Sequence, residues 1–168
     1  MNISVENLSF AYGEKHVLKN ISLFIRSGET VGIVGISGGG KSTFLKLLSG
    51  LYDVQNGNIA IGDTARTAIE RRKCVSMVMQ NAMLFPASIR DNILCGHEIT
   101  ESVLRHACNM AQLSDWISTL PAGIDTFVGE RGGSVSGGQA QRISIARAIA
   151  KIRLWFYWMN QPRRLTVI

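Results

Sequence analysis

The run from Gly35 to Ser42, GISGGGKS, combines residue types and a spacing that suit chemistry on phosphates. It fits the pattern G-x-x-x-x-G-K-[S/T], in which glycines let successive backbone N–H groups point at phosphate oxygens. Lys41 is then placed to reach the β- and γ-phosphates, and the Ser42 hydroxyl to take one ligand position on Mg²⁺. The sequence therefore predicts a nucleoside triphosphate site, and the alternative is a glycine-rich turn without a ligand. The predicted binding residues of this segment are Gly35, Ile36, Ser37, Gly38, Gly39, Gly40, Lys41, Ser42 and Thr43.

The elements on either side of this loop are the ones that would position it. Residues 30–34 are predicted to form a short buried strand, and residues 43–48 a helix. The N-terminus of such a helix adds a partial positive charge where the phosphates would lie. A strand, a glycine-rich loop and a helix in this order favour the phosphate site over the bare turn.

A second candidate anion site lies about a hundred residues later, in the run VSGGQ that opens a predicted amphipathic helix. Ser136 can donate a hydrogen bond to a phosphate, and the two glycines allow close approach of the backbone at a helix N-terminus. The alternative is an ordinary serine N-cap followed by a glycine-rich turn. The residues of this second motif are Val135, Ser136, Gly137, Gly138 and Gln139.

The rest of the chain alternates between short strands and helices, which indicates an α/β protein without repeats or low-complexity linkers. Apolar alternation predicts strands, and proline or a capping residue marks the starts of helices. The predicted strands lie around Ile3–Leu8, Ile21–Ile25, Ile59–Ile61 and Val75–Met79, and the predicted helices begin at Pro86, at Thr100 and after Gln139.

Charge and cysteine content exclude some classes of partner. The net charge is +6, but Lys151, Arg153, Arg163 and Arg164 all lie after residue 150, where no acidic residue occurs. The remaining body carries 14 basic and 12 acidic residues, so we expect no nucleic-acid face. Three irregularly spaced cysteines predict reduced, buried thiols of a cytosolic protein. No apolar stretch approaches the roughly 20 residues of a membrane-spanning helix.

With these motifs in this order, residues 1–150 resemble the ATP-binding domain of ATP-binding-cassette (ABC) transporters. The resemblance implies an α/β P-loop cassette with a mixed sheet: an antiparallel β subdomain, a parallel core and a helical signature subdomain. We expect the C-terminal part of that domain to be missing. We divide the chain into a cassette portion, 1–150, and an aberrant basic and aromatic tail, 151–168.

The resemblance also assigns roles to single residues and implies ATP and Mg²⁺ as ligands. Tyr12 matches the aromatic residue that stacks on adenine, with Val17 beneath the ring; the alternative is a turn tyrosine packed on the sheet. Gln80 matches the glutamine that ligates Mg²⁺ and senses the membrane domain; otherwise it is a polar residue at a strand end. Val135–Gln139 matches the family signature LSGGQ, with Val in place of Leu.

Members of this family dimerise head to tail, so that each ATP lies between the phosphate loop of one domain and the signature of the other. The resemblance therefore implies a second ABC ATP-binding domain as a partner. The segment Gly129–Gly132 resembles the exporter version of a region that contacts a transmembrane domain, although a charged turn is the alternative. The segment Leu84–Ile93 resembles the exporter version of the region after Gln80. We expect a peripheral location on the cytoplasmic face of a membrane through such a partner.

The tail departs from the family. A member should have a strand ending in Asp-Glu and later a switch histidine, yet no acidic residue follows Glu130 and the last histidine is His106. No catalytic residue is therefore intact, and we expect weak ATP binding and poor hydrolysis. The main alternative is a non-catalytic nucleotide-binding or interaction remnant of a disrupted gene. Soluble ABC proteins of DNA repair or translation are disfavoured because the chain has no coiled-coil insertion or tandem cassette, and a P-loop kinase is disfavoured by the signature. We also expect residues 154–159 to form a strand beside the phosphate-loop strand.

The genetic code offers a reason for the departure. If the tail is read one base out of register, the codons across Tyr157, Trp158, Met159 and Asn160 give Leu, Asp and Glu, and no other choice is possible. The neighbouring codons permit Asn-Pro before this run and Pro-Thr-Ser-Ala-Leu-Asp after it. The hidden frame thus contains the missing strand and loop, and we interpret the tail as the result of a single-base shift near codon 151.

Overall fold

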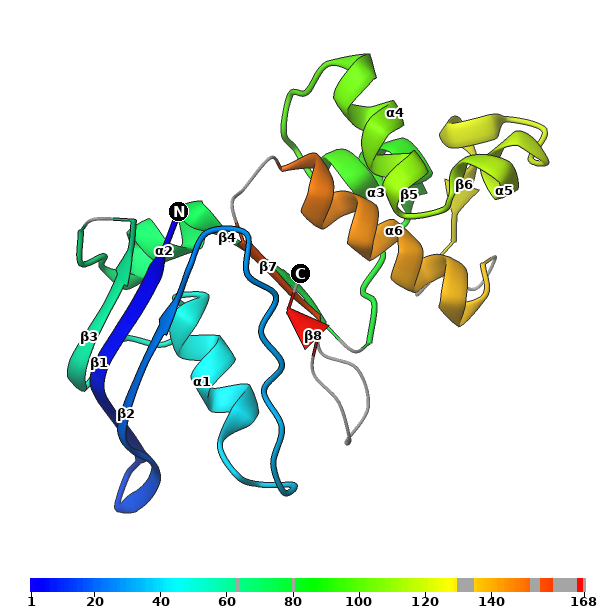
Figure 1. Ribbon diagram of the computed structural model, residues 1–168. Coiled ribbons are helices and arrows are strands. Elements are labelled where there is room, and N and C mark those ends of the chain that lie inside the picture. Colours follow the sequence, from blue (N-terminus) through cyan, green and yellow to red (C-terminus); the bar gives the residue numbers. More distant parts are fainter. Residues whose placement is uncertain (63, 80, 130–134, 152–154, 159–165, 168) are drawn as a thin grey trace. The chain divides into compact units, whose positions relative to one another are not determined.

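The computed structural model describes residues 1–62, 64–79, 81–129, 135–151, 155–158 and 166–167 (Figure 1). The chain divides into two compact units, one made of residues 1–77 and 153–168 and the other of residues 78–152. The division between cassette and tail at residue 150 stays a prediction. None of the helices in the described ranges combines the length and apolar character that crossing a bilayer requires.

The first unit contains a three-stranded antiparallel sheet in the order β2-β1-β3 (Figure 1). Ile3 pairs with Ile25 on one side and with Ile61 on the other, and Tyr12 pairs with Lys15 at the hairpin end. The expected strands around residues 3–8, 21–25 and 59–61 are thereby confirmed, since apolar alternation puts one face of each strand into the core. The elements that make up this part are β1 (Ile3–Tyr12), β2 (Lys15–Ile25), α1 (Lys41–Leu48), β3 (Asn56–Ile61) and α2 (Ala68–Cys74).

Helix α1 is the predicted helix of residues 43–48, and it packs its apolar side on this sheet. Leu45 and Leu47 have no exposed surface, and Phe44 and Leu48 are almost as well buried. They share one cluster with the inward-facing residues of the three strands. Burying a leucine side chain is worth about 2 kcal/mol, so this core fixes the helix, and with it the loop that precedes it.

The strand predicted for residues 30–34 is wrong: residues 29–36 belong to no strand in the described part of the chain. The alternation of burial is nevertheless there, because Val31 and Ile33 pack against the core while Val34 is 75% exposed. What is missing is a neighbouring strand. An extended segment becomes a strand only when another strand pairs with its backbone groups, and no described residue supplies that partner.

The tail does form a strand, but with other neighbours than expected. Strand β7 (Trp155–Trp158) lies between β4 (Val75–Val78) and β8 (Thr166–Val167), and the expected neighbour, residues 30–34, is not in this sheet. Tyr157 pairs with Val167 in an antiparallel hairpin. The predicted strand character is therefore confirmed for residues 155–158, and the predicted pairing is corrected, because β8 occupies one edge of β7 and β4 the other.

The second unit is mainly helical, and its core holds α3, α4 and α6 together (Figure 1). The helix expected from Pro86 begins three residues later, because the side chains of Ser88 and Asp91 form a reciprocal cap at the start of α3. Thr100 caps α4 as predicted. The elements are β5 (Ala87–Ser88), α3 (Ile89–Leu94), α4 (Glu101–Met110), α5 (Ser114–Ser118), η1 (Gly123–Asp125), β6 (Phe127–Val128) and α6 (Gly137–Ala150).

The three cysteines are free thiols, of which Cys108 is buried while Cys74 and Cys95 are half-buried. Burial raises the pKa of the Cys108 thiol, because the thiolate would lose its hydration in the core of the second unit. The expected burial of the thiols is thus complete for one residue and partial for two.

Candidate functional site

The phosphate loop reaches α1 through two glycines in the left-handed region, Gly38 with φ of 80° and Gly40 with φ of 83°. Gly40 is the N-cap of α1, no side chain caps the helix, and its first turn contains no acidic residue. The first N–H groups of a helix have no intrahelical acceptor. This end of α1 therefore presents free backbone donors and a partial positive charge to an anion.

Gly40 also lies close to the second strand. A Cβ atom at Gly40 would come within 2.8 Å of Cδ2 of Leu18 and within 3.1 Å of the Val17 carbonyl oxygen. Only a residue without a side chain fits there in this conformation. The start of α1 is thereby pressed against β2 beside Val17, one of the residues predicted to line the nucleotide site.

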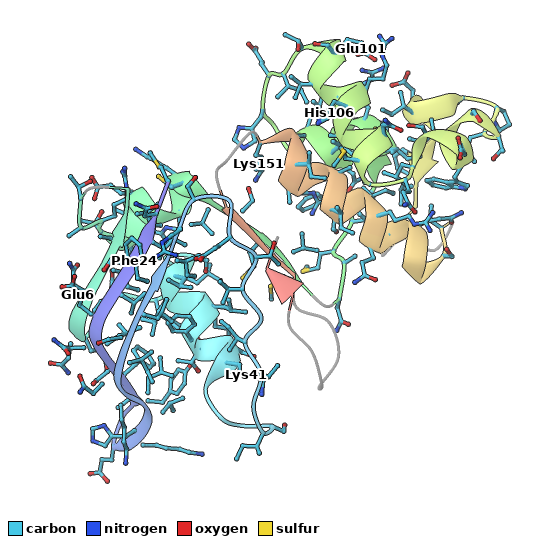
Figure 2. All side chains as sticks on the ribbon, in the orientation of Figure 1. Glu6, Phe24, Lys41, Glu101, His106 and Lys151 are labelled. Atoms are coloured by element: carbon cyan, nitrogen blue, oxygen red, sulfur yellow. The ribbon has the colours of Figure 1, made fainter. Side chains whose placement is uncertain are left out.

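Lys41 lies at the start of α1, and its ammonium group turns back over the loop (Figure 2). Nζ donates hydrogen bonds to the carbonyl oxygens of Gly35, at 2.8 Å, and Ile36, at 2.6 Å. Residues 35–39 are exposed, and Ile36 is 83% exposed. The cation is therefore held at the mouth of the loop, where an incoming phosphate would replace two neutral carbonyl acceptors.

Tyr12 and Thr43, which are 31 residues apart, meet at the first turn of α1. The Tyr12 hydroxyl and the Thr43 hydroxyl are 3.2 Å apart and form a hydrogen bond. That contact lowers the pKa of Tyr12, and the Tyr52 side chain and the charge of Lys46 lower it further against the opposing effect of burial. Tyr12, Val17, Gly40 and Thr43 thus lie in one neighbourhood, as a single nucleotide site requires.

The predicted Mg²⁺ ligands are only partly described. The Ser42 hydroxyl is exposed on the first turn of α1 and offers the hard oxygen atom that Mg²⁺ prefers. Gln80, the other predicted ligand, lies outside the described residues. Within the described ranges, no three His, Cys, Asp or Glu side chains gather as a metal site would require. Ser42 fits one position on the ion, and phosphate oxygens and water would fill positions that protein side chains leave open.

The second motif is the start of α6, and Ser136 is its N-cap. The Ser136 hydroxyl oxygen accepts a hydrogen bond of 3.2 Å from the Gln139 N–H, while Oε1 of Gln139 accepts one of 2.8 Å from the Ser136 N–H. Ser136 is therefore an ordinary N-cap, since its hydroxyl oxygen accepts a hydrogen bond from the backbone of α6. Among the described hydrogen bonds the Ser136 hydroxyl donates none, and a Cβ at Gly137 would meet no described atom within 4 Å.

The exporter-like segments fall partly within the described residues. Gly129 is described, whereas residues 130–134 lie outside the described ranges. In the segment 84–93, Phe85 is 52% exposed and Ile93 is fully buried. Met83, 76% exposed, and Phe127, 62% exposed, are further exposed apolar residues of the same unit.

Arg147 of α6 is a structural residue that no motif or spacing in the sequence points to. Nε donates a 2.7 Å hydrogen bond to the Asn92 carbonyl oxygen, and Nη1 donates a 3.0 Å bond to that of Met83. The guanidinium also lies over the Phe85 ring, 5.5 Å from its centroid. Burial lowers the pKa of Arg147. A single arginine in an alanine-rich helix carries no pattern that indicates such contacts.

Comparison with known proteins decides the family. A sequence model of the family described as "ABC transporter" matches residues 18–154. The chain belongs to the ABC transporter family. The match ends inside the tail, close to the point where the predicted reading-frame change begins.

Relatives of this ABC cassette include large exporters. It is 44% identical over 153 residues to an ATP-dependent lipid A-core flippase of Syntrophus aciditrophicus. The aligned region covers 89% of this chain and 26% of the flippase. It is 43% identical over 151 residues to an ATP-binding/permease protein of Staphylococcus aureus, with 86% and 26% covered. The chain therefore spans about a quarter of the length of these relatives.

A solved structure supports the same family at the level of the fold. The cassette superposes on the structure of a bacterial Atm1-family ABC exporter with ATP bound, with a TM-score of 0.83 and 36% identity. That match covers 90% of this chain and 27% of the other. The chain has the P-loop α/β fold of an exporter-type ABC cassette, over part of the full domain.

Proposed function

We propose that this chain binds MgATP at the loop of residues 35–43, as the ATP-binding part of an ABC exporter. The observation that carries the proposal is the uncapped start of α1 beside the Lys41 ammonium, which Gly35 and Ile36 hold at the loop mouth. Backbone donors, a helix N-terminus and a cation converge there, and each of them favours a phosphate. Tyr12 and Val17 flank the same turn and supply the surface for the base.

The chemistry of binding follows from these residues. Lys41 would exchange its two carbonyl acceptors for phosphate oxygens, which makes two neutral hydrogen bonds into charge-assisted ones. Ser42 would hold one position on Mg²⁺, and Gln80 is proposed as a further ligand. Mg²⁺ would neutralise charge on the β- and γ-phosphates. The Ser136 hydroxyl proton and the open backbone at Gly137 and Gly138 would bind the γ-phosphate of an ATP held by a second cassette.

Hydrolysis is proposed to be poor in this chain. A positioned general base contributes about 10²–10⁴-fold to a rate, and no carboxylate follows Glu130 in the sequence. The whole protein's partners are proposed from the relatives: a second cassette, arranged head to tail, and a transmembrane domain on the cytoplasmic face of a membrane. Phe85 is an exposed apolar residue in the exporter-like segment 84–93, which is proposed to meet that domain.

A non-catalytic nucleotide-binding or interaction remnant is the second candidate. The specific observation in its favour is the tail, where Trp158 and Met159 stand in place of the Asp-Glu pair that the family resemblance implies. A nucleotide-binding remnant shares the binding step with the first candidate and differs from it in turnover, whereas an interaction remnant differs in both.

Calorimetric titration of the 168-residue chain with MgATP and MgAMP tests the binding step. We expect binding of ATP and at least tenfold weaker binding of AMP, which has no β- or γ-phosphate; equal affinities would contradict the proposed site. A parallel assay of phosphate release separates the candidates. Turnover comparable to that of an intact exporter cassette would refute the proposed loss of catalysis, and no detectable turnover favours the remnant.

A further inference from the structure

The Tyr12 ring contacts two aromatic rings, Phe10 and Tyr52, to which no role has been assigned. Phe10 lies 5.0 Å from its ring, centroid to centroid, at an interplanar angle of 84°, and Tyr52 lies 5.8 Å away at 81°. Both neighbours are edge-to-face contacts, so neither ring stacks on Tyr12. Tyr12 remains 44% exposed, which leaves ring surface for a ligand.

The partner ring, Tyr52, is itself fixed from several directions. It stacks on Phe10, with the centroids 5.6 Å apart and the planes 18° from parallel, and Nζ of Lys46 lies 5.4 Å from its centroid. The Tyr52 carbonyl oxygen accepts a 3.1 Å hydrogen bond from Arg71, which is only 2% exposed. A ring held at both its backbone and its face is a rigid support for its neighbour.

Gln55 fixes the backbone next to Tyr12. Its Oε1 atom accepts a 2.8 Å hydrogen bond from the Ala11 N–H, and its Nε2 atom donates a 3.0 Å bond to the Ala11 carbonyl oxygen. The side-chain amide thus pairs with Ala11 as a neighbouring strand would, just where β1 ends at Tyr12. Two bonds to one residue leave the end of the strand little freedom.

These contacts link the end of β1 to α1 and to the loop that follows it. Thr43 belongs to α1, and Tyr52 and Gln55 lie between α1 and β3. We propose that Thr43, Tyr52 and Gln55 are positioning residues, which hold the Tyr12 ring for stacking on the base of the nucleotide. The inference rests on the proposed ATP binding, and it adds that recognition of the base depends on the segment 51–55.

If these residues position Tyr12, binding of the base and binding of the phosphates depend on different residues of the chain. Tyr52 and Gln55 make no contact with residues 35–42 among the described interactions. Removing the Tyr52 ring should therefore weaken the part of the affinity that comes from adenosine and leave the part that comes from the phosphates. An aromatic contact contributes about 0.5–1.5 kcal/mol, which corresponds to a loss of about twofold to twelvefold in affinity.

The test compares MgATP with magnesium tripolyphosphate, which has the phosphates without adenosine, on the full 168-residue chain. In Tyr52→Ala we expect ATP affinity to fall about fivefold and tripolyphosphate affinity to stay unchanged; in Tyr52→Phe both should stay as in the parent. Phe24→Ala is the matched control: Phe24 is 57% exposed and pairs with Ser4, far along the hairpin from Tyr12. It should alter neither affinity.

Thr43→Val and Tyr12→Phe form a double-mutant cycle for the hydroxyl pair. Each should lower ATP affinity about threefold, and the double variant should lose no more than either single one, because both remove the same bond. Equal losses for ATP and tripolyphosphate in Tyr52→Ala would overturn the inference in favour of general destabilisation, and so would unchanged ATP affinity. If the parent chain binds neither ligand, the proposed function itself fails.

Discussion

Arg147 donates a 2.7 Å hydrogen bond to the carbonyl oxygen of Asn92 and thereby ties α6 to α3. Asn92 is fully buried, and its side-chain amide in turn bonds both backbone groups of Phe85. One arginine of α6 therefore holds part of the segment 84–93, which resembles the exporter version of the region after Gln80. Arg147 and Asn92 lie 55 residues apart in sequence, so this hydrogen bond joins two distant segments of the second unit.

We expect Arg147→Met to lower the free energy of unfolding by about 2–3 kcal/mol, because it leaves the Asn92 and Met83 carbonyl oxygens without their donor. Denaturation in urea followed by circular dichroism measures this. Arg142→Met is the control on the same helix: Arg142 makes one exposed bond, to the Gln112 carbonyl oxygen, and the change should cost less than about 1 kcal/mol. Equal losses in the two variants would contradict the link.

Gly40 and Gly38 have the same backbone conformation but differ in how much room each leaves for a side chain. Both have φ near 80°, but a Cβ would meet Leu18 at Gly40 and no atom within 4 Å at Gly38. Gly38→Ala should lower the free energy of unfolding by about 1–2 kcal/mol through the left-handed conformation alone. Gly40→Ala should lower it by about 2–4 kcal/mol, since overlap adds to that cost. Urea unfolding of both variants checks the difference, and an identical cost would show that β2 moves away freely.

Lys41→Met should lower MgATP affinity at least tenfold, because a charge-assisted hydrogen bond contributes about 1.5–3 kcal/mol. The stability of the chain should hardly change, since the two carbonyl acceptors of Lys41 lie on exposed residues and water replaces the ammonium. Isothermal titration and thermal unfolding measure the two effects. Lys19→Met removes an exposed lysine from β2 and should leave ATP affinity intact; a comparable loss there would mean that net charge, rather than the loop, attracts the nucleotide.

The Cys108 thiol gives stability a dependence on alkaline pH. Its pKa is raised in the folded chain by burial, so the folded state keeps the proton over a range where the unfolded thiol has lost it. The resulting contribution to stability is complete below the unfolded pKa, about 8.5, and is lost as pH rises above it. Under reducing conditions, the free energy of unfolding should fall more steeply between pH 8 and pH 10 in the parent than in Cys108→Ala.

The nucleotide sequence around codons 151–162 tests the origin of the tail. Leu-Asp-Glu in the hidden frame is forced by the residues, but the next two positions are free: Asn160 with Gln161 permits Pro or Ser, and Gln161 with Pro162 permits Thr or Ala. We expect C as the third base of the Asn160 codon and A as that of the Gln161 codon, which gives Pro-Thr. Codons that give Ser-Ala would count against a single-base shift.

The sequence predicted local features better than pairings between distant segments. Alternation of apolar residues placed β1 and β2, and the Thr100 cap placed α4, because each signal acts within a few residues. Residues 30–34 carry the same alternation, yet pairing depends on a strand supplied from far along the chain. Pro86 predicts a helix that starts too early, because the cap formed by Ser88 and Asp91, a pattern also visible in the sequence, sets the start of α3.

The candidate site divides in the same way. The glycines, Lys41 and Ser42 have a fixed spacing, so the sequence alone predicts them. Tyr52 is a lone aromatic residue in a loop, and no periodicity connects it with Tyr12, forty residues earlier. Its contact depends on the turn after α1, where Arg71 from α2 holds the Tyr52 backbone. Only the folded arrangement of α1, α2 and β1 brings these residues together.

The lack of a sheet partner for residues 29–36 bears on the thermodynamics of ligand capture. This backbone leads directly into the phosphate loop, and hydrogen bonds of a ladder do not restrain it in the described structure. Fixing a backbone residue costs about 1–2 kcal/mol in conformational entropy. If a bound triphosphate orders even three of these residues, several kcal/mol of entropy oppose binding, so capture would be driven by heat release. The enthalpy of binding measured by calorimetry would then show how many residues of this backbone become ordered only when the ligand binds.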